Sequence, residues 1–180
     1  MLSKGKILIA EPTMLDSTFN RTVVLLCEYN NEGSLGFVLN KKLNITVQDT
    51  IAKFPISNVP VFFGGPVQLD NLFFIHPYGD LLNDSKHIDK EIYWGGDYQQ
   101  LRTLLIDEII DINKIKFFIG YSGWDSGQLD TEIEENSWLI KDFSRNDFYN
   151  DSSLLWRKHL IKMDDKLKIW ANAPENYTLN

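Results

Sequence analysis

Short apolar segments rich in β-branched and aromatic residues constrain the fold of this chain more than any other feature. Segments of this kind predict β-strands. Val23–Cys27 is apolar at every position, which is typical of a strand covered on both faces. The expected strands are Lys6–Ala10, Thr22–Tyr29, Leu35–Leu39, Val59–Phe63, Leu72–His76, Ile92–Trp94 and Ile115–Ile119. The loop Asn30–Ser34 should close a hairpin between the second and third of them.

Helical spacing of apolar residues occurs in fewer places. Thr46 and Asp49 form a capping-box pattern ahead of a helix that Pro55 would end. Asp97 and Gln100 cap a second, more strongly amphipathic segment. Two further helices are expected at Gln128–Glu135 and Ser152–Met163.

The order of these elements shows no regular βαβ alternation, which favours an α+β fold over a doubly wound sheet. The 180 residues match one ordinary domain, without a linker or low-complexity tract, so we expect a single domain over residues 1–180. The N-terminal apolar run Ile7–Ala10 is too short for a signal peptide or a membrane helix. Cys27 is the only cysteine, which fits a reducing compartment. We therefore expect a cytoplasmic protein that does not span a membrane.

Charge is distributed unevenly along the chain. The formal net charge is −7, and residues 80–153 hold sixteen acidic against seven basic residues. Residues 154–170 carry instead an excess of lysine and arginine. That basic segment indicates either a local contact site or a solvated helix face. An acidic body repels phosphate backbones, so direct nucleic-acid binding is not expected.

Familiar cofactor and metal motifs are absent from the sequence. There is no GxxxxGK[ST] phosphate loop and no GxGxxG dinucleotide fingerprint. The histidines His76, His87 and His159 lie far apart, without an HExxH pattern or a cysteine pair. No cofactor and no metal site is predicted.

Two residues, Cys27 and Ser122, are candidate nucleophiles by residue type. Cys27 lies within VVLLCEY, where a thiol packs as a small hydrophobic side chain. Ser122 lies in GYSGW, which begins like the GxSxG elbow of hydrolases, but the fifth position is Trp124 instead of glycine. We predict no catalytic residue.

The segment Gly120–Leu129, GYSGWDSGQL, is the most distinctive part of the chain. Its glycines permit close approach of a neighbouring backbone, and Asp125 or Ser126 can cap the helix that follows. We interpret the segment as a strand-to-helix connection, and its aromatic and amide groups as a candidate binding surface. The candidate residues are Tyr121, Trp124 and Gln128.

Polar residues also follow several predicted strands, and they form a second set of binding candidates. Glu11, Asn40 and His76 lie at strand ends, and the hairpin places Arg21 near Asn40. Arg21 can bind an anion or pair with a carboxylate such as that of Glu11. Gly64 and Gly65, in GGPV, can form a backbone anion nest or a tight turn.

Long segments of the chain resemble the YqgE/AlgH family of bacterial proteins. They are IAEPTMLDSTFNRTVVLLCEYNNEGSLGFVLN at 9–40, FFGGPVQLDNLFFIH at 62–76, YWGGD at 93–97 and GYSGWDSGQLDTEI at 120–133. The resemblance implies a complex, partly barrel-like β-sheet surrounded by helices. The resemblance implies no established catalytic activity or cofactor. The AlgH name of the family reflects a suggested role in transcriptional regulation.

We therefore expect a non-enzymatic binding or regulatory module with an unidentified protein or small-molecule partner. The alternative is a small-molecule-binding protein or hydrolase-like enzyme. Its pocket would be formed by the strand ends and Gly120–Leu129.

Overall fold

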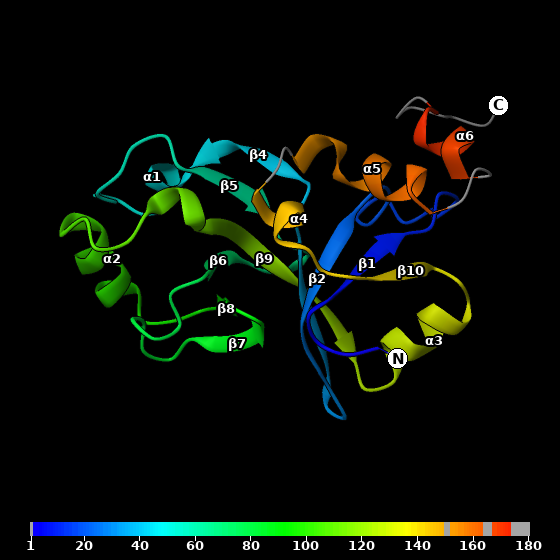
Figure 1. Ribbon diagram of the computed structural model, residues 1–180, viewed down its shortest axis with the longest axis horizontal. Coiled ribbons are helices and arrows are strands. Elements are labelled where there is room, and N and C mark those ends of the chain that lie inside the picture. The colour runs from blue at the N-terminus through cyan, green and yellow to red at the C-terminus, as the bar shows by residue number, and fades with distance from the viewer. Residues whose placement is uncertain (1, 150–151, 164–166, 174–180) are drawn as a thin grey trace.

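Strand β9 (Lys116–Asp125) organises the fold because it pairs with three other strands along its length. In this computed structural model, which describes residues 2–149, 152–163 and 167–173, the strand crosses the centre of the molecule (Figure 1). Its first half pairs in parallel with β5 (Pro60–Phe63) and antiparallel with β6 (Val67–His76). Its second half pairs antiparallel with β3 (Gly33–Val38).

The remaining strands extend the sheet in two directions from these neighbours. On one side, β3 continues through β2 (Val23–Asn30) and β1 (Lys6–Ala10) to β10 (Trp138–Asp142). On the other side, β6 continues through β8 (Ile92–Trp94) to β7 (Lys86–Asp89), and β4 (Lys42–Thr46) pairs with β5. The described residues thus form one ten-stranded sheet whose two ends do not meet. This confirms the predicted α+β fold with a partly barrel-like sheet.

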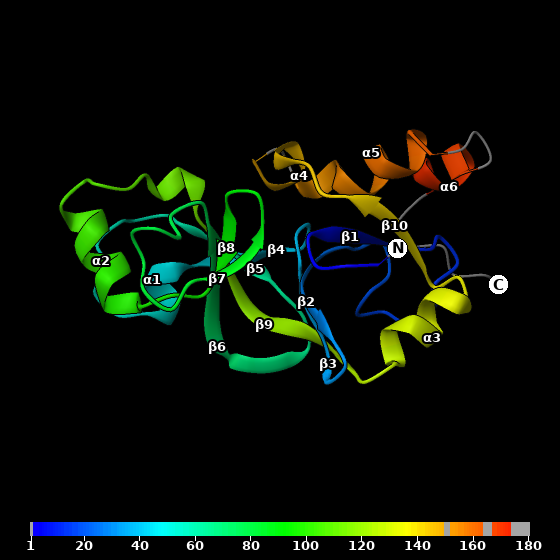
Figure 2. The ribbon, with the colours of Figure 1, turned by 60° about the horizontal axis from the view of Figure 1, so that its bottom comes forward.

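Short helices surround the sheet. They are α1 (Val47–Thr50), α2 (Tyr98–Ile106), α3 (Gln128–Glu134), α4 (Arg145–Tyr149), α5 (Leu155–Ile161) and α6 (Lys168–Ala171), with 3-10 turns at Ile112–Lys114 and Ser152–Leu154. Helices α1 and α2 lie at the end of the molecule formed by β4 to β8, and α3, α5 and α6 lie at the other end (Figure 1). Helices α4 to α6 run along one side, next to β1 and β10 (Figure 2).

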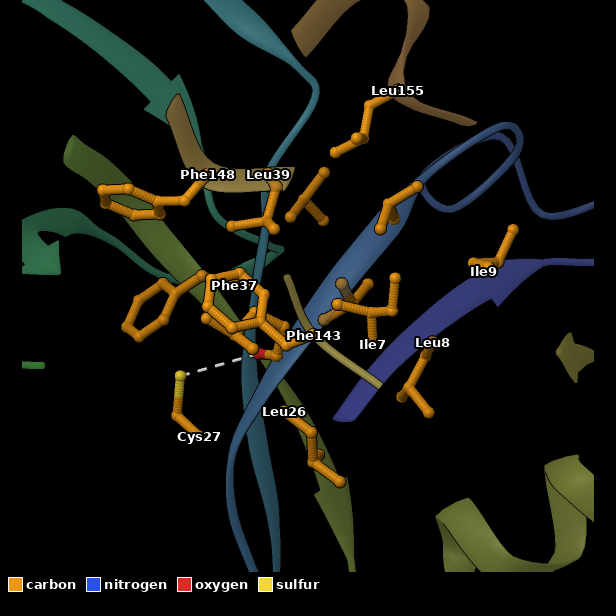
Figure 3. Packing of buried hydrophobic residues seen from close by; sticks show 14 of the residues in the cluster. Ile7, Leu8, Ile9, Leu26, Cys27, Phe37, Leu39, Phe143, Phe148 and Leu155 are labelled. Atoms are coloured by element: carbon orange, nitrogen blue, oxygen red, sulfur yellow. Dashed lines mark hydrogen bonds between the residues drawn. The ribbon is translucent and has the colours of Figure 1, made fainter. Parts of the chain in front are cut away.

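Two hydrophobic clusters stabilise the two ends, and β9 contributes to both. Successive side chains of a strand point to opposite faces, so Phe118 belongs to the cluster around β1, β2 and β3, while Phe117 belongs to the cluster around α2. Phe148 of α4 and Leu155 of α5 face the first cluster (Figure 3). The indole of Trp156 donates a 2.8 Å hydrogen bond to the Ala10 carbonyl, which fixes α5 on the end of β1.

The predicted caps at Thr46 and Asp97 are confirmed. The Asp49 carboxylate accepts hydrogen bonds from the amide and the hydroxyl of Thr46, and these bonds lower the pKa of Asp49. The Asp97 side chain accepts from the Gln100 amide at 2.9 Å. Helix α1 nevertheless ends at Thr50, five residues before the proline that was expected to end it.

The structure corrects the prediction for Gly120–Leu129. Residues 120–125 continue strand β9 instead of forming a connecting loop, and only Ser126 and Gly127 form the turn. The residue preceding α3 is Gly127 in a left-handed conformation (φ 75°), so neither Asp125 nor Ser126 caps the helix. Strands β4, β7 and β10 were not predicted.

Candidate functional site

A groove lined by basic side chains lies between the ends of the β2–β3 hairpin and helices α5 and α6. Its volume is about 1200 Å³. The described lining residues are Ser17, Thr18, Asn20, Arg21, Asn40, Lys41, Lys42, Leu43, Phe63, Ser153, Leu154, Trp156, Arg157, Ala171, Asn172 and Ala173. We call this feature the basic groove, because its described lining contains four lysine or arginine residues and no aspartate or glutamate.

Asn40 builds one wall of the basic groove. Its side-chain oxygen accepts a hydrogen bond from the Val23 amide, and its side-chain nitrogen donates to the Arg21 carbonyl, both at 2.8 Å. These bonds join the end of β3 to the start of β2. They also fix the backbone of Arg21, which has a positive φ of 55°. The nearness of Arg21 and Asn40, expected from the hairpin, is therefore confirmed.

Arg21 reaches toward the C-terminal helices. Its guanidinium lies 5.2 Å from the ring centroid of Trp156 and donates a 2.9 Å hydrogen bond to the Ala173 carbonyl. Glu11 accepts hydrogen bonds from the amide and hydroxyl of Thr13, and the ion pairs of the described residues do not join it to Arg21. The suggested pairing of Arg21 with Glu11 is therefore not formed.

The other cations approach the groove from both sides. The Lys41 ammonium donates to the carbonyls of Ser17 and Thr18 at 3.4 and 2.7 Å. Burial lowers the pKa of Lys41, and the nearby Asp16 carboxylate opposes this shift. From α5, the Arg157 guanidinium donates to the side-chain oxygen of Asn172. The groove thus gathers four cationic side chains, and the Asp16 carboxylate lies near one of them, Lys41.

Tyr121 and Trp124 line a different, smaller cleft of about 350 Å³. Glu28, Glu32 and Asp125 also line it, so its charge is opposite to that of the basic groove. Of the predicted binding residues, Arg21 and Asn40 thus line the basic groove. Tyr121 and Trp124 line this second cleft, which we call the acidic cleft.

The polar groups of the Gly120–Leu129 segment bond within the fold. Glu132 of α3 accepts hydrogen bonds from the indoles of Trp124 and Trp138 at 2.9 and 2.8 Å. The Gln128 side chain accepts from the Asp125 amide and donates to Glu132. This network fixes α3 against β9 and β10.

Ser122, Gly64 and Gly65 lie where the β5–β6 connection crosses β9. The fully buried Ser122 hydroxyl donates to the Gly64 carbonyl at 3.0 Å, so it does not face a substrate pocket. A β-carbon at Gly65 would lie 2.2 Å from the Tyr121 carbonyl carbon, and its φ is 153°. Only glycine allows this close approach of the two backbones.

His76 is buried at the end of β6, away from the basic groove. Its Nδ1 accepts a hydrogen bond from the Tyr78 amide, so its Nε2 carries the proton and donates to the Gly95 carbonyl at 2.8 Å. Burial lowers its pKa to about 4, against the upward effect of the bond to Gly95. A neutral ring held in this way supports the sheet, and His76 lines neither the basic groove nor the acidic cleft.

Cys27 is buried in the first hydrophobic cluster, as its sequence context indicated. Its thiol contacts the Leu25 carbonyl oxygen at 3.6 Å (Figure 3). Burial raises the pKa of the thiol, with a smaller contribution from the Glu28 carboxylate. The neutral thiol is a poor nucleophile.

Sequence reasoning missed one residue of chemical interest, Lys116. It is 9% exposed and lines a third cavity, beyond the basic groove. The sequence does indicate this residue, because Lys116 is the single charged residue in the otherwise apolar predicted strand Ile115–Ile119.

Among the residues that the structure describes, no three or more His, Cys, Asp or Glu side chains gather in a way that could hold a metal ion. Within the same ranges, no helix has the length and apolar character needed to cross a membrane.

Relatives of this chain match it over nearly its whole length. A UPF0301 protein from Cytophaga hutchinsonii is 42% identical over 182 residues, covering 100% of both chains. A UPF0301 protein from Chlorobium limicola is 41% identical and covers 99% of this chain and 96% of its own. One from Bacteroides thetaiotaomicron is 39% identical, with 99% and 91% covered.

Solved structures with the same fold include the AlgH protein from Pseudomonas aeruginosa. It superposes with a TM-score of 0.75 at 24% identity, covering 96% of this chain and 95% of its own. The protein DIP2367 from Corynebacterium diphtheriae gives a TM-score of 0.76 at 19% identity, with 96% and 93% covered. The family model described as AlgH-like, DUF179, matches residues 7–168. The chain therefore belongs to the AlgH-like family.

Proposed function

We propose that this protein is a non-enzymatic binding module whose basic groove takes an acidic segment of a partner protein. One observation carries the proposal: in a chain of net charge −7, Arg21, Lys41, Lys42 and Arg157 surround one groove whose described lining contains no carboxylate. Clustering of like charges costs free energy unless an opposite charge is bound nearby. An anionic ligand relieves that repulsion.

The size and the remaining lining favour a peptide over a small molecule. The volume of about 1200 Å³ exceeds the range of roughly 300–1,000 Å³ that is usual for small-molecule pockets. Trp156, Phe63 and Leu43 offer apolar contacts between the cations, while Asn20 and Asn172 carry amide groups that can bond a peptide backbone. An acidic segment with interspersed apolar residues satisfies both kinds of group.

This function supports a regulatory role exerted through a protein partner. The acidic body repels a nucleic-acid backbone at a distance. A short, flexible acidic peptide fits within the groove, so it avoids the repulsion that a long nucleic-acid backbone would meet from the acidic surface around the groove. We therefore place any effect on transcription downstream of a protein–protein contact.

The proposal is tested by fluorescence anisotropy with a fluorescein-labelled oligoglutamate peptide that contains interspersed leucines. We expect saturable binding that weakens as salt is raised. Arg157→Ala removes one charge-assisted contact, so it should weaken binding about tenfold. Lys158→Ala is the matched control, because Lys158 is exposed on the same helix but does not line the groove.

Two results would contradict the proposal. One is the absence of saturable binding at low salt, where charge attraction is strongest. The other is equal loss of affinity in both α5 variants, which would indicate a diffuse charge effect. Tighter binding of a single-stranded oligonucleotide of equal charge would point to nucleic acid instead.

A further inference from the structure

Lys116 places an isolated ammonium group in an apolar environment. The side chain lies on the face of β9 that also carries Phe118. Its Nζ is 4.5 Å from the ring centroid of Phe62 and 5.2 Å from that of Phe148. The residue is 9% exposed, and within the described part of the chain its ammonium has neither a hydrogen-bond acceptor nor a carboxylate partner.

Lys116 lines a cavity of about 510 Å³. The lining combines apolar side chains with a few polar ones: Lys42, Ile56, Ser57, Asn58, Val59, Pro60, Phe62, Ile112, Asn113, Ile115, Lys116, Phe148 and Tyr149. This volume is within the range of roughly 300–1,000 Å³ that small molecules occupy. No aspartate or glutamate is present in this described lining.

Burying the Lys116 ammonium lowers the stability of the folded state. Two aromatic faces attract the ammonium but replace its lost hydration only in part. Burial accordingly lowers the pKa of Lys116 to about 8 from an ordinary value of 10.5. A packed hydrophobic side chain would avoid the cost, so a role that needs the amine explains its presence better than packing does.

We propose that this cavity binds a small organic carboxylate, with the anionic group at Lys116 Nζ and a hydrocarbon body against the apolar wall. A carboxylate supplies the acceptor that the ammonium lacks, and a charge-assisted hydrogen bond is about twice as strong as a neutral one. Phe62, Phe148 and Ile56 form the surface that accepts the hydrocarbon. The amides of Asn58 and Asn113 and the Ser57 hydroxyl lie on the same lining and can bond further polar atoms.

This site is distinct from the basic groove, although Lys42 lines both. Lys42 is therefore left unchanged in the test. Loss of peptide binding in the groove and loss of carboxylate binding at Lys116 can then be told apart.

The test is titration with straight-chain carboxylates from butanoate to octanoate and with benzoate, followed by nuclear magnetic resonance of the lysine side chains. We expect saturable binding that strengthens with chain length. The matched neutral amides should bind about tenfold more weakly or worse, because they lack the charge that pairs with the ammonium. The Lys116 resonance, assigned by its loss in Lys116→Met, should titrate at higher pH in the complex.

Variants separate the site from the fold. Lys116→Met should abolish carboxylate binding while the circular dichroism spectrum is retained. Lys114→Met should bind like the parent protein, because Lys114 is exposed and outside the cavity lining. Ser57→Asp keeps Lys116 but adds a negative charge at the rim, so it should weaken binding, whereas Ser57→Asn should not.

The pH dependence provides another readout. Lys42, Lys116 and Tyr149 are the titratable side chains in the described lining, and burial raises the pKa of Tyr149. Carboxylate affinity should fall as pH rises above about 8, where unliganded Lys116 loses its proton. The proposal is overturned if no probe saturates, if the amides bind as tightly as the carboxylates, or if Lys116→Met retains binding.

Discussion

His76 and Lys116 are two residues at which burial disfavours the charged form of the side chain. Both lie on adjacent strands of the sheet, yet their surroundings differ. The two ring nitrogens of His76 bond to Tyr78 and Gly95, so the neutral imidazole is satisfied. The Lys116 ammonium lies against the rings of Phe62 and Phe148 and has no hydrogen-bond acceptor among the described residues, so its polar group is unsatisfied.

His76 should make the protein sensitive to acid. Its pKa is about 4 in the folded chain and 6.5 ordinarily, so between these values the unfolded chain binds a proton that the folded chain does not. The free energy of unfolding should therefore fall as pH drops from 6.5 toward 4, by up to about 3 kcal/mol from this residue. Urea denaturation across this range should show a smaller fall in His76→Gln. His87→Gln, at an exposed position, should follow the parent protein, and identical slopes in all three proteins would refute the assignment.

Lys116→Met should stabilise the protein near neutral pH. The substitution removes a poorly solvated charge and keeps the length of the side chain, so we expect a gain of roughly 1–3 kcal/mol. The gain should shrink as pH rises from about 8 toward 10.5, because the folded parent protein loses its proton earlier than the unfolded chain does. Thermal denaturation of both proteins at several pH values measures this difference in stability. A loss of stability at pH 7 would mean that Lys116 holds the fold together.

At the scale of elements, the Glu132 carboxylate of α3 holds the Gly120–Leu129 segment in place. Glu132 accepts both indole hydrogen bonds, from Trp124 of β9 and Trp138 of β10. Phe19 packs against the same two rings at centroid distances of 6.2 and 5.6 Å. The segment therefore stabilises this end of the molecule.

Glu132→Ala should be strongly destabilising. It leaves two buried indole groups without an acceptor, so we expect a loss of about 2–4 kcal/mol in the free energy of unfolding. Chemical denaturation measures the change. Glu134→Ala, at an exposed site on the same helix, should stay within about 0.5 kcal/mol of the parent protein. Comparable losses in both variants would contradict this role of Glu132.

The sequence predicts the buried strands and misses the partly polar ones. Segments such as Val23–Cys27 and Ile92–Trp94 show their apolar character directly. Strand β7 buries only Ile88 fully, so it carries no recognisable alternation. Glycines at 120 and 123 suggested a loop, whereas the structure uses Gly120 within β9, where the β5–β6 connection crosses at close range. Such contacts between distant segments leave no local pattern.

At the scale of the whole molecule, the basic groove depends on long-range folding. Its lining comes from residues near position 20, from the start of β4 and from the C-terminal helices. The hairpin register was enough to predict that Arg21 lies near Asn40. It could not predict that Arg157 and Asn172 close the opposite wall, because nothing in the sequence fixes how α5 and α6 pack.

The most direct test of the proposed function maps peptide binding on the backbone amides by nuclear magnetic resonance. The acidic peptide should shift signals of Ser17–Arg21, Asn40–Leu43, Ser153–Arg157 and Ala171–Ala173, and leave those around Tyr121 and Trp124 unchanged. Arg157→Ala should reduce these shifts at a fixed peptide concentration. Shifts centred on another surface, or none at low salt, would contradict an acidic-segment site in the basic groove.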